Sequence, residues 1–188
     1  PTSSRDDGSL HTSQSESLAL KILPEFIYQK KIYLVAYPTV YVGLGRRKPD
    51  VNKAIIDAIN EGTLLLNYIG HGSPELWAHE NVFVKTTTIP QLKNSNYFFL
   101  TAATCDFGLY DDPAIQSSAE TMMNLQNAGS ILAYTSSRIV YSNYNAELNE
   151  ILYNNLFNLK DNGLPARVGL SYYMTKQYRS EEHTSELQ

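Results

Sequence analysis

The sequence contains a single cysteine, no long apolar run and no strongly basic segment. One cysteine excludes an internal disulfide framework and a zinc site built from several cysteines. No apolar segment approaches the roughly 20 residues that a membrane-spanning helix needs, so we expect no transmembrane segment in these 188 residues. The formal net charge is −4, and the basic run Arg46–Lys48 is bounded by glycine and proline. This charge pattern argues against nucleic acid as a partner.

The two ends of the chain differ from its middle. Residues 179–188 match the in-frame translation of a common sequencing adapter, so we exclude them from the predicted domain. The chain begins at Pro1 in a polar run without a methionine, and we expect it to start inside a longer protein. Residues 1–178 are enough for one domain with a sizeable core, which we expect to be truncated at both ends.

Two short apolar runs end at residues that can carry chemistry. Thr63–Gly72 stops at His71 between two glycines, and Tyr97–Cys105 ends at the cysteine. Both runs are too short for an ordinary helix and are bounded by polar or turn residues, which favours buried strands of a parallel sheet. Parallel strands bring their C-terminal ends to one edge, where ligands collect in open α/β sheets. We therefore expect His71 and Cys105 to meet there.

The other segments alternate between strand and helix patterns. The strand-like segments are residues 30–38 and 130–136, and the helix-like segments are residues 13–26, 50–62, 114–127, 143–159 and 165–177. In the helix that ends at Gly62, Asp50 is the expected cap. Its apolar residues have the spacing of one buried face: Val51, Ala54, Ile55, Ala58 and Ile59. The alternation predicts an α/β fold with a mostly parallel sheet flanked by helices on both faces.

A cysteine and a histidine at neighbouring strand ends could work together. The thiolate is the nucleophile, so a catalytic cysteine needs an imidazole to accept its proton. The oxyanion needs donors, each worth about 3 kcal/mol in the transition state, and the amides of Gly72 and Cys105 could supply them. The alternative is structural, because a free cysteine at a strand end is often a buried small hydrophobe. The pairing with His71 favours catalysis, and both interpretations stay open from the pattern.

Three motifs resemble those of one family: Asn67–Ser73, Leu76–Ala78 and Thr101–Phe107. They are similar to the histidine and cysteine motifs of gingipain-type cysteine peptidases, a branch of the caspase-like clan. The sortase-like members that act in type IX secretion are most similar, on three further segments: Cys105–Pro113, Ser118–Glu120 and Ser136–Tyr141. The resemblance runs from about Asp6 to Gln177 and implies a caspase-like three-layer sandwich.

The resemblance also implies roles for individual residues. Cys105 would be the nucleophile, His71 the general base and acid, and the amides of Gly72 and Cys105 the oxyanion hole. Trp77 would line the substrate pocket. An upstream acid orients the histidine in the family, and Asp7 is the residue in the right region, with a solvated turn as the alternative.

Other polar groups allow a functional and a structural interpretation. Asp111, Asp112 and Glu120 could bind calcium, as some gingipain-type domains do, although Asp-Asp-Pro is also an ordinary helix start. We expect no metal or other cofactor, with calcium as the alternative. Arg138 could pair with an acid near the site or bind a substrate carboxylate, and we expect a structural role.

A second polar group lies after the histidine motif. Glu75, His79 and Glu80 are metal-binding types without the two-histidine spacing of a helical metal site. We expect loop polar groups, with Glu80 a candidate for substrate selectivity.

The resemblance implies a cysteine endopeptidase or transpeptidase that works through a thioester acyl-enzyme. Its substrates would be proteins, specifically the C-terminal sorting domains of secreted cargo, at the outer membrane or cell surface of a bacterium. A non-catalytic caspase-like scaffold or surface-assembly module is the alternative. Retention of both His71 and Cys105 argues against that scaffold.

Overall fold

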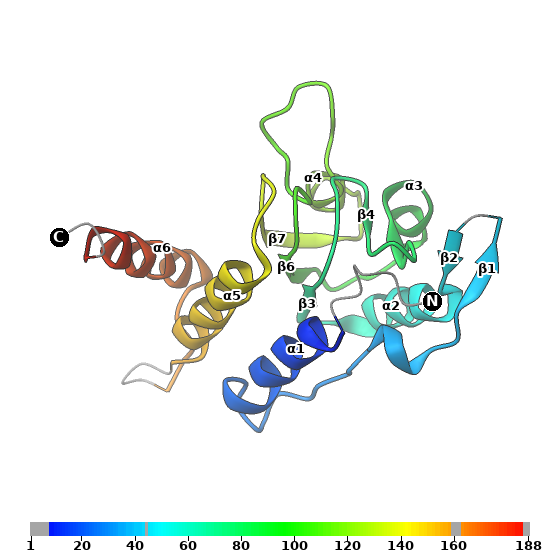
Figure 1. The fold of residues 1–188 in the computed structure, drawn as a ribbon. Coiled ribbons are helices and arrows are strands. Elements are labelled where there is room, and N and C mark those ends of the chain that lie inside the picture. Colours follow the sequence, from blue (N-terminus) through cyan, green and yellow to red (C-terminus); the bar gives the residue numbers. More distant parts are fainter. Residues whose placement is uncertain (1–7, 44, 159–162, 186–188) are drawn as a thin grey trace. The chain divides into compact units, whose positions relative to one another are not determined.

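The computed structural model describes residues 8–43, 45–158 and 163–185. Figure 1 shows its elements in chain order. They are α1 (Leu10–Lys21), the 3₁₀ turn η1 (Leu34–Ala36), β1 (Val40–Val42), β2 (Gly45–Arg47), α2 (Pro49–Gly62), β3 (Leu65–Ile69), β4 (Leu76–Trp77), β5 (Phe83–Val84), α3 (Lys85–Thr88), the 3₁₀ turn η2 (Ile89–Gln91), β6 (Phe98–Ala103), α4 (Ser118–Met123), β7 (Ser130–Thr135), α5 (Ser142–Phe157) and α6 (Val168–Ser185). The chain forms two compact units, residues 30–142 and residues 1–29 with 143–188.

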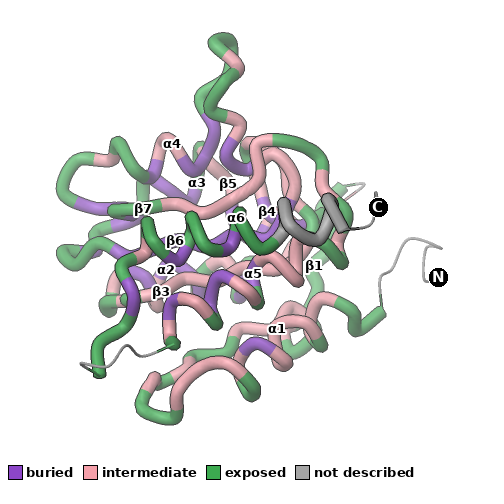
Figure 2. Tube along the Cα trace, turned by 90° about the vertical axis from the view of Figure 1, so that its left-hand side faces the viewer, coloured by how far each residue is buried: buried purple, intermediate pink, exposed green. Residues whose placement is uncertain are grey.

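A parallel sheet in the order β3-β6-β7 organises the unit of residues 30–142. The register pairs Leu65 with Phe99 and Ile69 with Ala103, and β7 pairs with the other edge of β6. All residues of β6 are buried, and Figure 2 maps burial along the chain. The predicted parallel pairing is therefore confirmed for these three segments. The predicted burial holds fully only for β6, because the residues of β3 are half-buried and Ile131 and Leu132 of β7 are exposed.

The core of this unit lies where helices pack on one face of the sheet. Alternate residues of β6 point to that face, as the period of a strand requires. The residues of the core are Val51, Ile55 and Ile59 of α2, Phe98, Leu100 and Ala102 of β6, and Ala119 and Met122 of α4, together with loop residues. Burial of such side chains contributes about 1.5–3 kcal/mol each, so the predicted face of α2 holds this helix on the sheet.

Helix α2 begins at Pro49, and its cap differs from the predicted one. Pro49 occupies the first helical position, where its missing N–H costs nothing, and Lys48 is the N-cap residue. The prediction that Asp50 caps the helix is wrong, because Asp50 lies inside the first turn. Its negative charge still interacts favourably with the helix dipole there.

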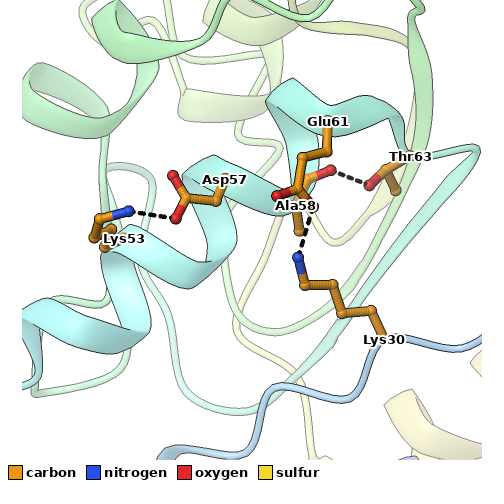
Figure 3. A network of polar contacts seen from close by, with 6 residues as sticks. All are labelled: Lys30, Lys53, Asp57, Ala58, Glu61 and Thr63. Carbon is orange, nitrogen blue, oxygen red and sulfur yellow. Dashed lines mark hydrogen bonds and ion pairs between the residues drawn. The ribbon is translucent and has the colours of Figure 1, made fainter.

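Polar contacts on the exposed side of α2 join it to the chain before and after it (Figure 3). Within the helix, Lys53 pairs with Asp57 one turn later. Lys30 donates to Glu61 at 2.8 Å. The Thr63 hydroxyl donates to the Ala58 carbonyl at 2.7 Å, which satisfies a carbonyl in the last turn. Exposed ion pairs contribute little, so burial determines the position of the helix.

The predicted strand at residues 30–38 is wrong. Within the described residues this segment contains only the turn η1, although Ile32, Leu34 and Tyr37 pack against the core. Its β-branched and aromatic residues therefore signalled burial. They did not signal a neighbouring strand, because pairing depends on a free sheet edge that composition does not reveal.

The predicted helix at residues 114–127 is also shorter than expected. Ser117 accepts a hydrogen bond from the Glu120 amide, and the Glu120 carboxylate accepts one from the Ser117 amide. This capping box starts α4 at Ser118. Ile115, which lies before α4, and Met123, its last residue, are exposed.

The second unit contains α1, α5 and α6. In α5 the buried residues are Asn149, Leu152, Tyr153 and Leu156, whose spacing forms one face of the helix. The Ala166 amide, just before α6, donates to the Leu156 carbonyl in the last turn of α5 at 3.1 Å. Among the described residues, the helices are all too short or too polar to cross a bilayer.

Gly129, just before β7, provides a test of this packing. Its φ is 93°, and an added Cβ would collide with the Met122 carbonyl oxygen. The buried Asn94 side chain also clamps its backbone through both its N–H and its carbonyl. We expect Gly129→Ala to lower the free energy of unfolding by about 1–2 kcal/mol for the left-handed backbone and by a further ~1–3 kcal/mol for the collision. Urea unfolding of the variant and the parent protein measures the sum of these two contributions.

Gly62→Ala is the matched control, because Gly62 has a φ of 109° and only one atom near an added Cβ, at 3.8 Å. In the Gly62→Ala control, the free energy of unfolding should fall only by the contribution of the left-handed backbone. Equal destabilisation of the two variants would contradict the packing around Gly129.

Candidate active site

The two predicted catalytic residues follow neighbouring strand ends. Ile69 and Ala103 are the last paired residues of β3 and β6, and His71 and Cys105 each lie two positions further on. The backbones are still joined one residue past the sheet, where the Gly70 amide donates to the Ala103 carbonyl at 3.3 Å. The predicted location of both residues at one sheet edge is therefore confirmed, while their catalytic roles stay predictions.

The loop after β3 folds back on itself immediately after His71. The Ala78 amide donates to the His71 carbonyl at 2.8 Å, and the Ser73 amide donates to the Leu76 carbonyl at 3.0 Å. These bonds flank an antiparallel bridge between Gly72 and Trp77. The His71 side chain is exposed, so the imidazole stands on a loop whose backbone is tied down.

An aromatic cluster anchors this loop in the core. Trp77 is 1% exposed and stacks on Tyr68, with ring centroids 4.3 Å apart and an interplanar angle of 8°. Its centroid is also 5.0 Å from that of Phe107, which follows Cys105 by two residues. Such aromatic pairs add about 0.5–1.5 kcal/mol beyond burial. The cluster thus links the loop of the histidine to that of the cysteine.

The predicted pocket role of Trp77 stays a prediction, since in this structure the ring is buried in the core. Glu80, the candidate for selectivity, has a side chain only 15% exposed and pairs with Arg46 at 3.2 Å. Both residues therefore support the histidine loop directly.

The loop after β6 turns sharply at the cysteine. Cys105 is half-buried, and its Sγ lies 3.7 Å from the Val140 carbonyl oxygen, to which the thiol donates. Asp106 has a φ of 53°, which is uncommon outside glycine. Backbone strain of this kind clusters at functional sites, and here it reverses the chain directly after the thiol.

Gly72 and Thr104 bring the two loops into contact. An added Cβ at Gly72 would collide with the Thr104 hydroxyl, and it would lie 3.2 Å from the Leu76 carbonyl oxygen. Glycine is therefore required for this close approach. Among the backbone–backbone hydrogen bonds between described residues, the amides of Gly72 and Cys105 donate none.

A segment after β7, Ser136–Val140, covers the cysteine loop. The Asp106 amide donates to the Arg138 carbonyl at 3.3 Å, and the Gly108 amide donates to the Ser136 carbonyl at 3.0 Å. The Arg138 guanidinium donates to both carboxylate oxygens of Asp111, at 2.8 and 2.6 Å. Hydrogen bonding to Arg138 lowers the pKa of Asp111. Arg138 therefore forms the predicted ion pair near the site.

Tyr68 is a site residue that sequence reasoning missed. Its hydroxyl donates to the His71 carbonyl at 2.7 Å, beside the bond from Ala78. Burial raises the pKa of the phenol, and the negative charge of Glu80 raises it further, against a smaller opposing effect of the Ala78 backbone. The available signal was its position three residues before His71 inside the motif, next to residues with assigned chemistry.

The three candidate calcium ligands have other partners. Asp111 binds Arg138, Asp112 accepts from the Ala114 amide, and Glu120 closes the capping box. Within the described residues, no three histidine, cysteine or acidic side chains gather in a metal-binding arrangement. Calcium binding by these three residues stays a prediction.

The other candidates can be placed only in part. Glu75 and His79 are exposed loop residues. The His79 ring lies 5.5 Å from the ring of His71. Asp7, the predicted orienting acid, lies outside the described residues.

The Arg138–Asp111 pair predicts a titration shift. Because the folded-state pKa of Asp111 is lowered, the pair stabilises the fold above the ordinary Asp range and loses that contribution as acid protonates the carboxylate. We expect Arg138→Ala to move the titration of Asp111 back to higher pH, as followed by carboxyl-carbon NMR. Arg46→Ala removes an arginine from a different carboxylate, Glu80, and should leave Asp111 unchanged. An identical Asp111 curve in all three proteins would contradict the ion pair.

Comparisons with known proteins agree on one family. The sequence model of peptidase family C25 matches residues 2–187. Gingipain R2 of Porphyromonas gingivalis (strain ATCC BAA-308 / W83) is 41% identical over 80 residues, which cover 41% of this chain and 10% of that protein. Gingipain R1 of Porphyromonas gingivalis is 40% identical over 80 residues, covering 41% of this chain and 8% of that protein. The chain thus spans about a tenth or less of these relatives.

Solved structures give the same answer for the fold. The crystal structure of the Arg-specific cysteine proteinase gingipain R (RgpB) superposes with a TM-score of 0.57 and 27% identity, over 64% of this chain and 28% of that one. A complex of the RgpB pro- and mature domains of Porphyromonas gingivalis gives 0.51 and 28%, over 56% and 25%. The predicted caspase-like α/β fold is confirmed.

Proposed function

Because the chain belongs to peptidase family C25, the gingipain-type family that its motifs predicted, we propose that it is a cysteine peptidase in which Cys105 is the nucleophile and His71 the proton carrier. One observation carries the proposal: each residue lies two positions past the last pair of adjacent parallel strands. Strand ends of this kind are where α/β folds place their chemistry.

In the first half of the reaction, the His71 imidazole accepts the proton of the Cys105 thiol. The thiolate attacks the carbonyl carbon of the scissile peptide bond, and a C–S bond forms. The carbonyl oxygen becomes an oxyanion, which accepts hydrogen bonds from the amides of Gly72 and Cys105. His71 then returns the proton to the departing amine as the C–N bond breaks, which leaves a thioester on Cys105.

In the second half, water or an amine attacks the thioester. His71 accepts a proton from the attacking group, the C–S bond breaks, and the thiol is restored. Attack by water makes the protein an endopeptidase, whereas attack by an amine makes it a transpeptidase. The contact between Gly72 and Thr104 supports this arrangement, because it joins the loops that carry the two amides.

The proposal predicts different outcomes for two neighbouring histidines. We expect Cys105→Ala to abolish cleavage of a fluorogenic peptide library, because the chain has no other cysteine. We expect His71→Ala to lower kcat/KM by about 10²–10⁴-fold, the usual contribution of a general acid–base. His79→Ala should leave cleavage unchanged, although its ring is 5.5 Å from that of His71.

Circular dichroism of each variant establishes that it is folded. Alkylation of Cys105 by iodoacetamide provides a second measurement that needs no substrate. Loss of activity in His79→Ala with full activity in His71→Ala would overturn the assignment of the base. Folded protein that neither cleaves the library nor alkylates faster than a free thiol would support the alternative, a non-catalytic caspase-like scaffold.

The substrates and location form the finer part of the proposal. The similarity to sortase-like members of the family supports secreted cargo as the substrate class, recognised through C-terminal sorting domains. That role would place the protein outside the cell, at the outer membrane of a bacterium. It also supports aminolysis of the thioester as the second step.

Mass spectrometry distinguishes the two second steps. We expect a peptide from a cargo sorting-domain junction to be cleaved, and an added amine such as glycylglycine to appear covalently joined to the upstream product. Hydrolysed product alone, at every amine concentration, would make the protein an endopeptidase. Cys105→Ala is the negative control, because neither the hydrolysed nor the amine-linked product can form without the thiol.

A further inference from the structure

Two hydrogen bonds converge on one backbone carbonyl beside the proposed catalytic residues. The His71 carbonyl oxygen accepts from the Tyr68 hydroxyl at 2.7 Å and from the Ala78 amide at 2.8 Å. The Tyr68 ring is itself fixed, because it stacks on the buried Trp77 and packs over the backbone of Gly70. The hydroxyl therefore reaches the carbonyl from a rigid support.

This carbonyl belongs to the same peptide group as the Gly72 amide. A peptide group is planar and trans, so its N–H points opposite to its carbonyl. With the His71 carbonyl held toward Tyr68 and Ala78, the Gly72 N–H must point away from both. The Gly70 amide, two residues earlier in the chain, already points at Ala103 of β6.

Hydrogen bonds to a carbonyl also polarise the whole peptide group. Hydrogen bonds in a chain strengthen one another, so two donors on the His71 oxygen make the Gly72 N–H a stronger donor. Preorganised hydrogen-bond donors make the largest single contribution to the rate enhancement of many enzymes, because they need no reorientation when charge develops in the transition state.

We propose that Tyr68 is a positioning residue for the oxyanion hole, which aims and polarises the Gly72 amide through the His71 carbonyl. This inference rests on the proposed function, since it assumes that Gly72 binds an oxyanion. Tyr68 itself does not touch the substrate. The phenol is a donor at neutral pH because the ordinary pKa of tyrosine is about 10, and burial raises that pKa further.

Two reactions of Cys105 separate the oxyanion hole from the nucleophile. In alkylation by iodoacetamide, the thiolate displaces iodide from carbon, a C–S bond forms, and no oxyanion arises. In acylation by p-nitrophenyl acetate, the thiolate adds to the ester carbonyl, an oxyanion forms, and the C–O bond breaks to release p-nitrophenolate. Both reagents are small, so neither requires knowledge of the natural substrate.

The test compares these two rates in Tyr68→Phe, which removes the hydroxyl and keeps the ring that stacks on Trp77. We expect acylation to slow by about tenfold, a fraction of the roughly 10²–10³-fold effect of removing an oxyanion donor. We expect alkylation to be unchanged, since Cys105 and His71 are intact. Tyr97→Phe is the matched control, because Tyr97 is 47% exposed beside β6, and it should change neither rate.

NMR of the Gly72 amide provides a readout that does not depend on reactivity. Loss of a hydrogen bond to the His71 carbonyl should move the nitrogen and proton shifts of Gly72 in Tyr68→Phe and leave them in place in Tyr97→Phe. An unchanged acylation rate, or an unchanged Gly72 resonance, would overturn the role of Tyr68. Alkylation no faster than that of a free thiol in the parent chain would instead overturn the proposed function.

Discussion

The register between β3 and β6 is the constraint on which the rest of this structure depends. A shift of one residue would turn every side chain of a strand to the other face, and Leu100, fully buried in the core, makes such a shift costly. The same register pairs Ile69 with Ala103 and thereby brings His71 and Cys105 to equal distances past the sheet. The packing of a hydrophobic core and the position of two polar residues are thus one property of the fold.

Strand ends alone do not make a rigid site, because the loops that follow them could move. Here each loop is held by its own second set of bonds. The bridge between Gly72 and Trp77 holds the histidine loop, and the segment Ser136–Val140 holds the cysteine loop. The contact between Trp77 and Phe107 then joins the two loops through the core. Sites supported by such surrounding contacts keep the geometry that catalysis needs.

The sequence predicted the parts of the fold that depend on local patterns. Apolar runs predicted β3, β6 and β7, and helical spacing predicted α2, because burial leaves a periodic signal. The prediction of a strand at residues 30–38 was wrong. Ile32 and Leu34 are apolar because they pack against the core, and the segment contains only a 3₁₀ turn. The start of α4 was readable in the Ser117–Glu120 capping box, yet the Asp-Asp-Pro sequence was the more visible start signal.

In the candidate site, too, the sequence predicted the features that leave a local signal and missed those that depend on packing. Residue type and position made His71 and Cys105 the candidates, because the chemistry of an imidazole and a thiol is visible in single residues. The resemblance placed Trp77 in the substrate pocket, and Glu80 was a candidate for selectivity. In the structure Trp77 is buried and Glu80 pairs with Arg46, and both substrate roles stay predictions. Sequence reasoning missed Tyr68 because an aromatic residue in an apolar run is typical of a buried strand. One hydroxyl on a partly buried ring can orient a peptide group that no sequence pattern marks, so the division of a motif into catalytic and packing residues fails where backbone amides carry the chemistry.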